Sequence, residues 1–121
     1  MALAEWRDHR GNRYLYINHA GTEQETLENI ERALELLRQS GSHDVPLLGN
    51  ITGAFGTDAV MEGIRRFARE SDPFVSRRAV VGLRGIQKVL FLTFNTLLRV
   101  HSAPRATEAE ALEYLFPERS S

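Results

Sequence analysis

The chain has 121 residues, of which 42% are hydrophobic and 26% charged, and its formal net charge is −1. These values are typical of one globular domain, here residues 1–121, that buries roughly two thirds of its extended surface. The sequence contains no cysteine, which excludes disulfides and thiolate chemistry. Residues 1–8 lack a secretory pattern, and no apolar run approaches the ~20 residues that span a bilayer. We therefore expect a cytoplasmic protein without stable membrane insertion.

Positive charge is concentrated in residues 62–88, which carry Arg65, Arg66, Arg69, Arg77, Arg78, Arg84 and Lys88. This surplus can attract an anionic partner, such as an acidic protein or a phosphorylated head group. The alternative is that the arginines form a solvated helix face. Because the chain as a whole is not basic, we expect no nucleic-acid binding.

The chain begins with two predicted strands. Residues 1–12 are expected to form a short edge strand around Trp6 and the turn that follows it. Residues 13–19 form the second strand, with Leu15 and Ile17 on one face and two tyrosines on the other.

A capped helix comes next. Thr22 and Glu25 have the spacing of a capping box, in which each side chain satisfies a free backbone amide at the helix start. Gly41 ends the helix. The buried stripe of this helix consists of Leu27, Ile30, Leu34 and Leu37.

Residues 45–52 form the predicted central strand, and a glycine-containing loop joins it to a second helix. Thr57 is the expected N-cap of that helix, which stops before Pro73. The next strand, residues 78–83, is apolar on both faces and therefore belongs inside the sheet.

The last predicted elements are a helix at 86–98, a short strand at 99–103 closed by Pro104, and a helix that begins after Thr107. Residues 117–121 are expected to be a frayed tail. Alternation of strands and helices predicts an α/β fold. It has a mostly parallel four- to five-stranded sheet, right-handed crossovers and helices on both faces.

Three stretches carry a family resemblance: LLGNITGAFGT, SRRAVVGLRG and TEAEALEYL. Together with the element order, they resemble the SpoIIAA-like superfamily, which holds the STAS domains and is related in fold to the CRAL-TRIO lipid-exchange domains. The resemblance covers about residues 13–116 and is similar to a subgroup of small stand-alone bacterial proteins without assigned function. It implies a non-enzymatic regulatory or protein-interaction module.

In regulatory STAS proteins the loop after the central strand carries a phosphorylated serine in an Asp-Ser-Ser/Thr-Gly motif. Aligning Phe55 with the family's phenylalanine in that loop places residues 57–60 against the motif. The usual phosphoacceptor position is then Ala59, and Thr57 is the nearby hydroxyl. The resemblance therefore implies phosphorylation control only through Thr57, whereas Asp58 supplies a fixed negative charge.

The first candidate site is the loop after the central strand, because ligands bind beyond the carboxyl ends of parallel strands. It would dock a protein partner or a small ligand. The alternative is that its glycines make the turn and its polar residues cap the helix. The candidate residues are Asn50, Thr52, Gly53, Phe55, Gly56, Thr57 and Asp58.

The second candidate site is the helix at 86–98, which has more large apolar residues than one buried stripe requires. The helical pattern places Leu97 on the buried face and Lys88 and Asn95 on a thin wet strip. The large apolar residues outside the buried face need another surface to cover them. A homodimer contact is the leading explanation, and the alternatives are an apolar ligand, a membrane surface or deeper burial. The candidate interface residues are Lys88, Phe91, Leu92, Asn95 and Leu98.

Catalytic and metal-binding patterns are not found in the sequence. The four histidines share no metal-ligand spacing, and the serines lack the context of an activated nucleophile. We therefore predict a protein that is not an enzyme and needs no cofactor or metal. The sequence favours a dimeric interaction module with a regulatory protein partner, and the alternative is a carrier or sensor of a small apolar or lipid-like ligand.

Overall fold

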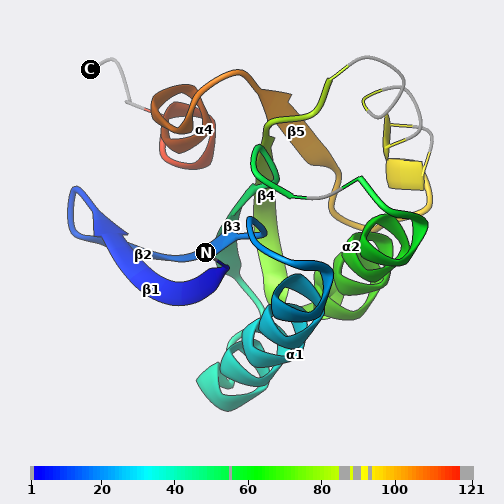
Figure 1. The fold of residues 1–121 in the computed structure, drawn as a ribbon. Helices are drawn as coiled ribbons and strands as arrows, with labels where there is room; N and C mark the ends of the chain where they lie inside the picture. The colour runs from blue at the N-terminus through cyan, green and yellow to red at the C-terminus, as the bar shows by residue number, and fades with distance from the viewer. Residues whose placement is uncertain (1, 55, 85–87, 89–90, 93, 118–121) are drawn as a thin grey trace.

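The computed structural model describes residues 2–54, 56–84, 88, 91–92 and 94–117. Its centre is one five-stranded sheet in the order β1-β2-β3-β4-β5 (Figure 1). The strands are β1 (Leu3–His9), β2 (Asn12–Asn18), β3 (Val45–Asn50), β4 (Val75–Val81) and β5 (Ser102–Arg105). β1 is antiparallel to β2, and all the other pairs are parallel. The predicted mostly parallel α/β sheet is confirmed.

Three helices of the described residues have clear sequence signals at their starts. They are α1 (Glu23–Ser40), α2 (Asp58–Ser71) and α4 (Glu108–Leu115). Each begins after a threonine N-cap whose hydroxyl accepts a hydrogen bond from a backbone amide of the first turn. In α1 the capping box is complete, and Gly41, at a φ of 66°, ends the helix.

The helices cover both faces of the sheet, with α1 and α2 on one face and α4 on the other (Figure 1). The alternation in β2 explains this arrangement. Leu15 and Ile17 belong to the core beneath α1 and α2, whereas Tyr14 and Tyr16 belong to a second core beneath α4. The predicted assignment of these side chains to two faces of β2 is therefore correct, and the structure adds that both faces are buried.

The last two strands differ from the prediction. A 3₁₀ turn at Asp72–Phe74 leads directly into β4, which therefore starts at Val75 rather than at Arg78. In β5, Pro104 is paired with Val80 and does not close the strand as predicted. A proline fits here because β5 is the edge of the sheet, where one side needs no hydrogen-bond donor.

The predicted helix at 86–98 is shorter than expected. Its described residues 88, 91–92 and 94–95 are helical, and 96–97 form a turn. The amide of Leu98 donates to the carbonyl of Asn95, so the chain tightens and leaves the helix before Leu98. Residues 118–121 of the predicted tail lie outside the described residues. Within the described part of the chain, no helix is long and apolar enough to cross a membrane.

Candidate functional site

Asn50, at the end of β3, is a structural junction between three segments. Its carbonyl accepts from the amide of His19 at 2.9 Å, and its side-chain oxygen accepts from the amide of Thr52 at 2.9 Å. Its side-chain NH₂ donates to Glu108 Oε2 at 2.7 Å. The hydrogen bonds of Asn50 fix the loop after β3 and leave this residue with a mainly structural role.

Glu108 connects α4 to the sheet, a relationship that the sequence did not predict. Besides Asn50, its Oε2 accepts from the hydroxyl of Tyr16 at 2.6 Å. Burial raises the pKa of Tyr16, and the hydrogen bond to the Glu108 carboxylate raises it further. Tyr16 therefore keeps its proton at neutral pH and donates it to this bond.

Thr57 and Asp58 lie at the start of α2, as predicted. The Thr57 hydroxyl accepts from the amide of Val60 at 3.2 Å and donates to Glu23 Oε1 at 2.9 Å. A phosphate on Thr57 would replace the donated proton and face the Glu23 carboxylate, which disfavours it electrostatically. Phe55 lies outside the described residues.

Two glycines allow close approach of the loop to its neighbours. A Cβ on Gly53 would lie 2.8 Å from the Cβ of Ala20. Gly82, just after β4, has a φ of +99°, and a Cβ there would lie 2.6 Å from the amide nitrogen of Thr52. The loop after β3 and the end of β4 are therefore pressed together.

Beside these contacts, a cavity of about 160 Å³ lies at the carboxyl ends of β3 and β4. Its lining consists of Ile51, Thr52, Ala54, Gly56, Met61, Gly82 and Arg84. Thr52 and Gly56 were predicted site residues, whereas Arg84 joins them from the segment after β4. We call this cavity the carboxyl-edge pocket.

Most of the basic residues predicted to attract an anionic partner are paired within the chain. Arg65 and Arg69 lie within ion-pair distance of Glu62, and Arg66 contacts Glu31 and Glu70. The alternative of a solvated, ion-paired helix face therefore describes these three arginines. Arg84 and Lys88 are exposed, and neither has a carboxylate partner within the described part of the chain.

The predicted interface helix is corrected at several positions. Phe91 and Leu98 are only 5% and 7% exposed, so their own subunit already covers them. Asn95, predicted on the wet side, is buried, and its side chain exchanges hydrogen bonds of 2.9 and 2.8 Å with the backbone of Ser102. Leu97, predicted to be buried, is 79% exposed because it lies in the turn that follows the helix.

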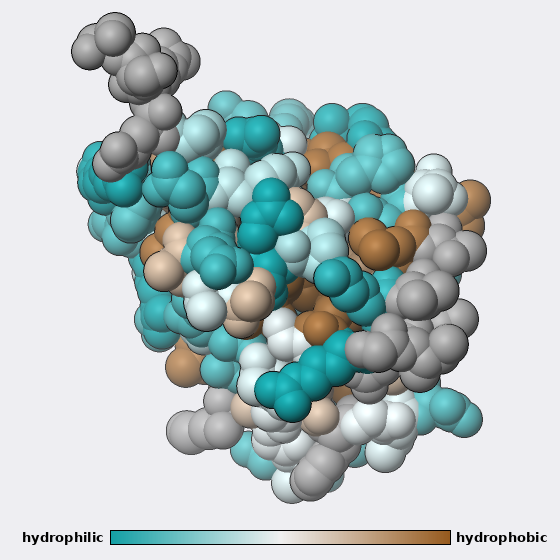
Figure 2. Space-filling view, turned by 90° about the horizontal axis from the view of Figure 1, so that it is seen from above, coloured by the Kyte–Doolittle hydropathy of each residue, from teal (hydrophilic) through white to brown (hydrophobic). Residues whose placement is uncertain are grey.

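Leu92, at 40% exposure, and Leu97 are the exposed large hydrophobic residues of the described chain. Figure 2 shows one face of the molecule as mostly hydrophilic, with small separate hydrophobic patches. Among the predicted interface residues, Phe91 and Leu98 are therefore buried, whereas Leu92 stays exposed.

A small, partly open cavity lies between the sheet and α2. Its volume is about 20 Å³, which suits one water molecule, and its lining includes His19, Phe67, Arg78 and Phe91. His19 Nδ1 and Arg78 Nε are buried and have no hydrogen-bond partner among the described residues. Burial lowers the pKa of His19 to about 4 and that of Arg78 to about 10, so His19 is neutral and Arg78 charged at pH 7.

Arg78 binds the carboxyl end of α2, which explains how the core accepts it. Its terminal nitrogen donates to the carbonyl of Ala68 at 3.2 Å and to the hydroxyl of Ser71 at 2.9 Å. Asp72 lies 4.0 Å away and supplies an opposing charge. The negative end of the helix dipole adds to this stabilisation.

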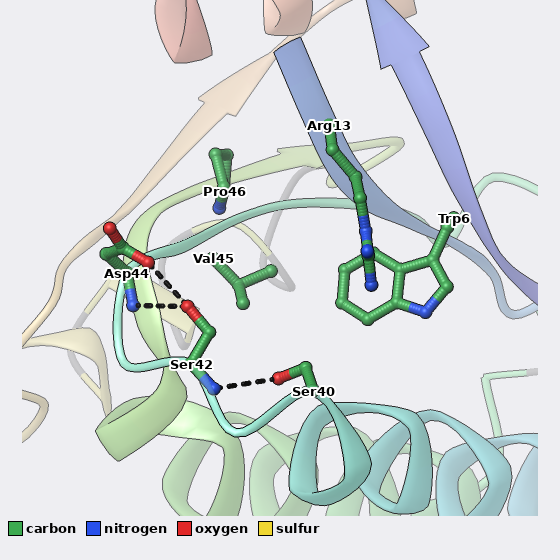
Figure 3. Close-up of a pocket in the computed structure, with 7 residues that line it drawn as sticks. All are labelled: Trp6, Arg13, Ser40, Ser42, Asp44, Val45 and Pro46. Carbon is green, nitrogen blue, oxygen red and sulfur yellow. Dashed lines mark hydrogen bonds between the residues drawn. The ribbon is translucent and has the colours of Figure 1, made fainter.

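A third cavity, not predicted from the sequence, lies at the amino end of β3, opposite the carboxyl-edge pocket (Figure 3). Its volume is about 230 Å³, and it contains the tryptophan and one arginine of the β1–β2 hairpin. Its lining consists of Trp6, Arg13, Ser40, Ser42, Asp44, Val45 and Pro46. We call it the amino-edge pocket.

The consecutive strand order, the antiparallel edge strand and the helices on both faces define a SpoIIAA-like α/β fold. This fold was predicted from the sequence, and the comparison with solved structures confirms it. The chain is similar to the crystal structure of an uncharacterised DUF3478-family protein with a SpoIIAA-like fold from Shewanella loihica PV-4. The TM-score is 0.73 and the sequence identity 16%, over 94% of this chain and 93% of that chain. At this identity the likeness shows the fold alone. The sequence matches no protein-family model and no curated protein.

Proposed function

We propose that this protein is a non-enzymatic interaction module that binds an acidic segment of a partner protein at the carboxyl-edge pocket. The observation that carries the proposal is the convergence of the loop after β3 with Arg84 on one cavity of about 160 Å³. Parallel sheets bind ligands at this edge, because loops and helix starts meet there.

The charge of the pocket favours an acidic partner. Arg84 is exposed and has no carboxylate partner in the described residues, unlike Arg65, Arg66 and Arg69. Its planar guanidinium can donate two parallel hydrogen bonds to one carboxylate of a partner. Exposed Lys88, four positions further along the chain, adds a second positive charge to the same segment.

The lining residues favour binding over catalysis. Arg84 is their one charged side chain, and a guanidinium donates hydrogen bonds but has no acceptor atom. It can hold an anion but cannot act as a general base near neutral pH. The hydroxyl of Thr52 therefore has no base within the lining to activate it.

Among the described residues, the cavity between the sheet and α2 is too small to support the alternative of an apolar carrier. Its walls include the apolar side chains Leu47, Ile64 and Phe67, as a lipid site would need. Its volume of about 20 Å³, however, has room for one water molecule and not for an alkyl chain.

The homodimer proposal is kept in a narrower form. Phe91 and Leu98 cannot mediate it while they are buried, so Leu92 and Leu97 are the residues through which two copies would touch. Sedimentation of the wild-type protein and of Leu97→Asp tests this contact.

The experiment for the main proposal is chemical cross-linking in cells with three versions of the chain: wild type, Arg84→Glu and Arg69→Glu. Arg69 is an exposed arginine that pairs with Glu62 and lies outside the pocket lining, so it is a matched control. A true partner is captured by wild type and by Arg69→Glu and is lost with Arg84→Glu. The purified partner should then show the same order of affinities in calorimetry. Retention of every partner by Arg84→Glu contradicts the proposal.

A further inference from the structure

The amino-edge pocket has the chemistry of a site for a small molecule that carries two opposite charges. We propose that it binds a free α-amino acid with an apolar side chain, whose carboxylate pairs with Arg13 and whose ammonium group pairs with Asp44. This site is independent of the carboxyl-edge pocket, because it lies at the other end of β3 and shares no lining residue with it.

Arg13 is held ready for a carboxylate. Its guanidinium carbon lies 3.7 Å from the centre of the Trp6 ring, so the two planar groups are stacked (Figure 3). The antiparallel register places Arg13 opposite Asp8 and Trp6 opposite Leu15, which makes Arg13 and Trp6 diagonal neighbours on one face.

The stacking leaves the N–H groups at the edge of the guanidinium available. In the described part of the chain they have neither a hydrogen-bond acceptor nor a carboxylate partner. A guanidinium whose orientation is already fixed binds a carboxylate through two parallel hydrogen bonds with little further loss of entropy.

Asp44 supplies the opposite charge on the other side of the pocket. Its Oδ1 accepts from the hydroxyl of Ser42 at 2.5 Å, which orients the carboxylate (Figure 3). Asp44 forms no ion pair with any cation of the described residues. The carboxyl end of α1, represented in the lining by Ser40, adds partial negative charge. This side of the pocket favours an ammonium group.

The two charges together select a zwitterion. A simple anion would gain from Arg13 but would face Asp44 and the negative end of α1, and a simple cation would face Arg13. An α-amino acid carries both charges and can therefore offer its carboxylate to Arg13 and its ammonium group to Asp44. Trp6, Val45 and Pro46 form apolar walls against which its side chain packs. A volume of about 230 Å³ suits a ligand smaller than a drug-sized molecule.

The test uses leucine and 4-methylpentanoic acid, which has the same carbon skeleton without the amino group. Trp6 is the single tryptophan of the chain and lines the pocket, so its fluorescence reports occupancy without a label. Calorimetry gives a second readout that does not depend on Trp6. The variants are Arg13→Gln and Asp44→Asn, with Arg77→Gln as control. Arg77 is exposed, stacks on Tyr114 and is not one of the residues that line the pocket.

We expect leucine to saturate the fluorescence change and to bind about tenfold more tightly than the acid, because a charge-assisted hydrogen bond is lost with the amino group. Arg13→Gln should weaken both ligands about tenfold. Asp44→Asn should weaken leucine alone and leave the acid equal or tighter. Arg77→Gln should bind as wild type does.

Several results would overturn the proposal. They are no saturable signal with leucine or the other apolar amino acids, equal binding of leucine and the acid, or wild-type affinity in both Arg13→Gln and Asp44→Asn. Melting temperatures of the variants, measured in parallel, identify any change that comes from unfolding instead of from the site.

Discussion

Tyr16 on β2 and Glu108 on α4, 92 positions apart in the chain, are joined by a hydrogen bond of 2.6 Å. This bond links α4 to the sheet, and Asn50 of the neighbouring strand donates a second hydrogen bond to the same carboxylate. Asn50 and Glu108 therefore connect α4 to the carboxyl ends of the strands, where the carboxyl-edge pocket lies.

The first prediction concerns this link. Tyr16→Phe removes the hydroxyl and should lower the free energy of unfolding by about 1 to 2 kcal/mol, since hydrogen bonds to charged groups contribute more than neutral ones. Urea denaturation measures the change. Tyr114→Phe is the control, because the Tyr114 hydroxyl has no hydrogen bond to any described residue. Equal effects of the two substitutions would contradict the importance of the link.

The second prediction compares two glycines with positive φ. Gly82→Ala places a Cβ 2.5 Å from Thr52 Oγ1 and 2.6 Å from its amide nitrogen, so the backbone must move. Gly11 has a φ of +78°, but a Cβ there meets nothing within 4 Å. Gly11→Ala should cost about 1 kcal/mol through backbone strain alone, and Gly82→Ala at least about 3 kcal/mol. Denaturant midpoints of the purified variants give the comparison.

The third prediction is a pH dependence of stability that arises from His19. Burial lowers its folded pKa to about 4 from the 6.5 of an exposed histidine, so the unfolded chain binds a proton that the folded chain does not. The stability contributed by neutral His19 is complete above pH 6.5 and is lost as the pH falls toward 4. The expected loss across this interval is about 3 kcal/mol.

Denaturation curves between pH 4 and 7 test this dependence in wild type, His19→Leu and His101→Leu. His19→Leu should show a flatter profile than wild type, whatever its stability at pH 7. His101 is exposed, and its replacement should leave the wild-type slope in place. If His19→Leu keeps the full slope, other groups cause the acid sensitivity.

The fourth prediction separates core from surface in the segment 88–98. Phe91→Ala should destabilise the fold by about 3 to 5 kcal/mol because it empties a buried site, whereas Leu97→Ala should change stability by less than about 0.5 kcal/mol. Urea denaturation measures both changes.

The same segment contains the proposed dimer contact. In sedimentation, Leu97→Asp should be more monomeric than wild type if the exposed leucines join two copies. An unchanged sedimentation profile together with a wild-type dimer would place the contact elsewhere.

Local sequence signals predicted most of the fold correctly. The threonines at positions 22, 57 and 107 marked the helix starts, because capping depends only on residues within one turn. The two faces of β2 are also predicted by a local pattern, because successive side chains of a strand point to opposite faces. The prediction that Pro104 closes the strand is wrong because a proline is tolerated inside a strand at the edge of a sheet. The sequence alone does not show that β5 is an edge strand.

The candidate sites were harder to predict because they combine distant segments. The helical pattern predicts Asn95 on the wet strip, but its hydrogen bonds to the backbone of Ser102 make its burial favourable. The sequence predicts the loop after β3 as a candidate site. It indicates Arg84 only as one of the basic residues in 62–88, and not as a neighbour of that loop. The amino-edge pocket needs the β1–β2 register to bring Trp6 beside Arg13. In the sequence, this pocket is indicated only by a tryptophan and an arginine in the first two predicted strands.

The position of α4 in the chain has a consequence for biosynthesis. The apolar side chains Tyr14, Leu48 and Ala79 lie on the face of the sheet that α4 covers, and α4 follows all five strands. During translation the opposite face can be covered by α1 and α2 as soon as their strands emerge. The face that α4 covers stays exposed until Glu108–Leu115 has been made. The nascent chain therefore presents this apolar face to the ribosome exit and to chaperones.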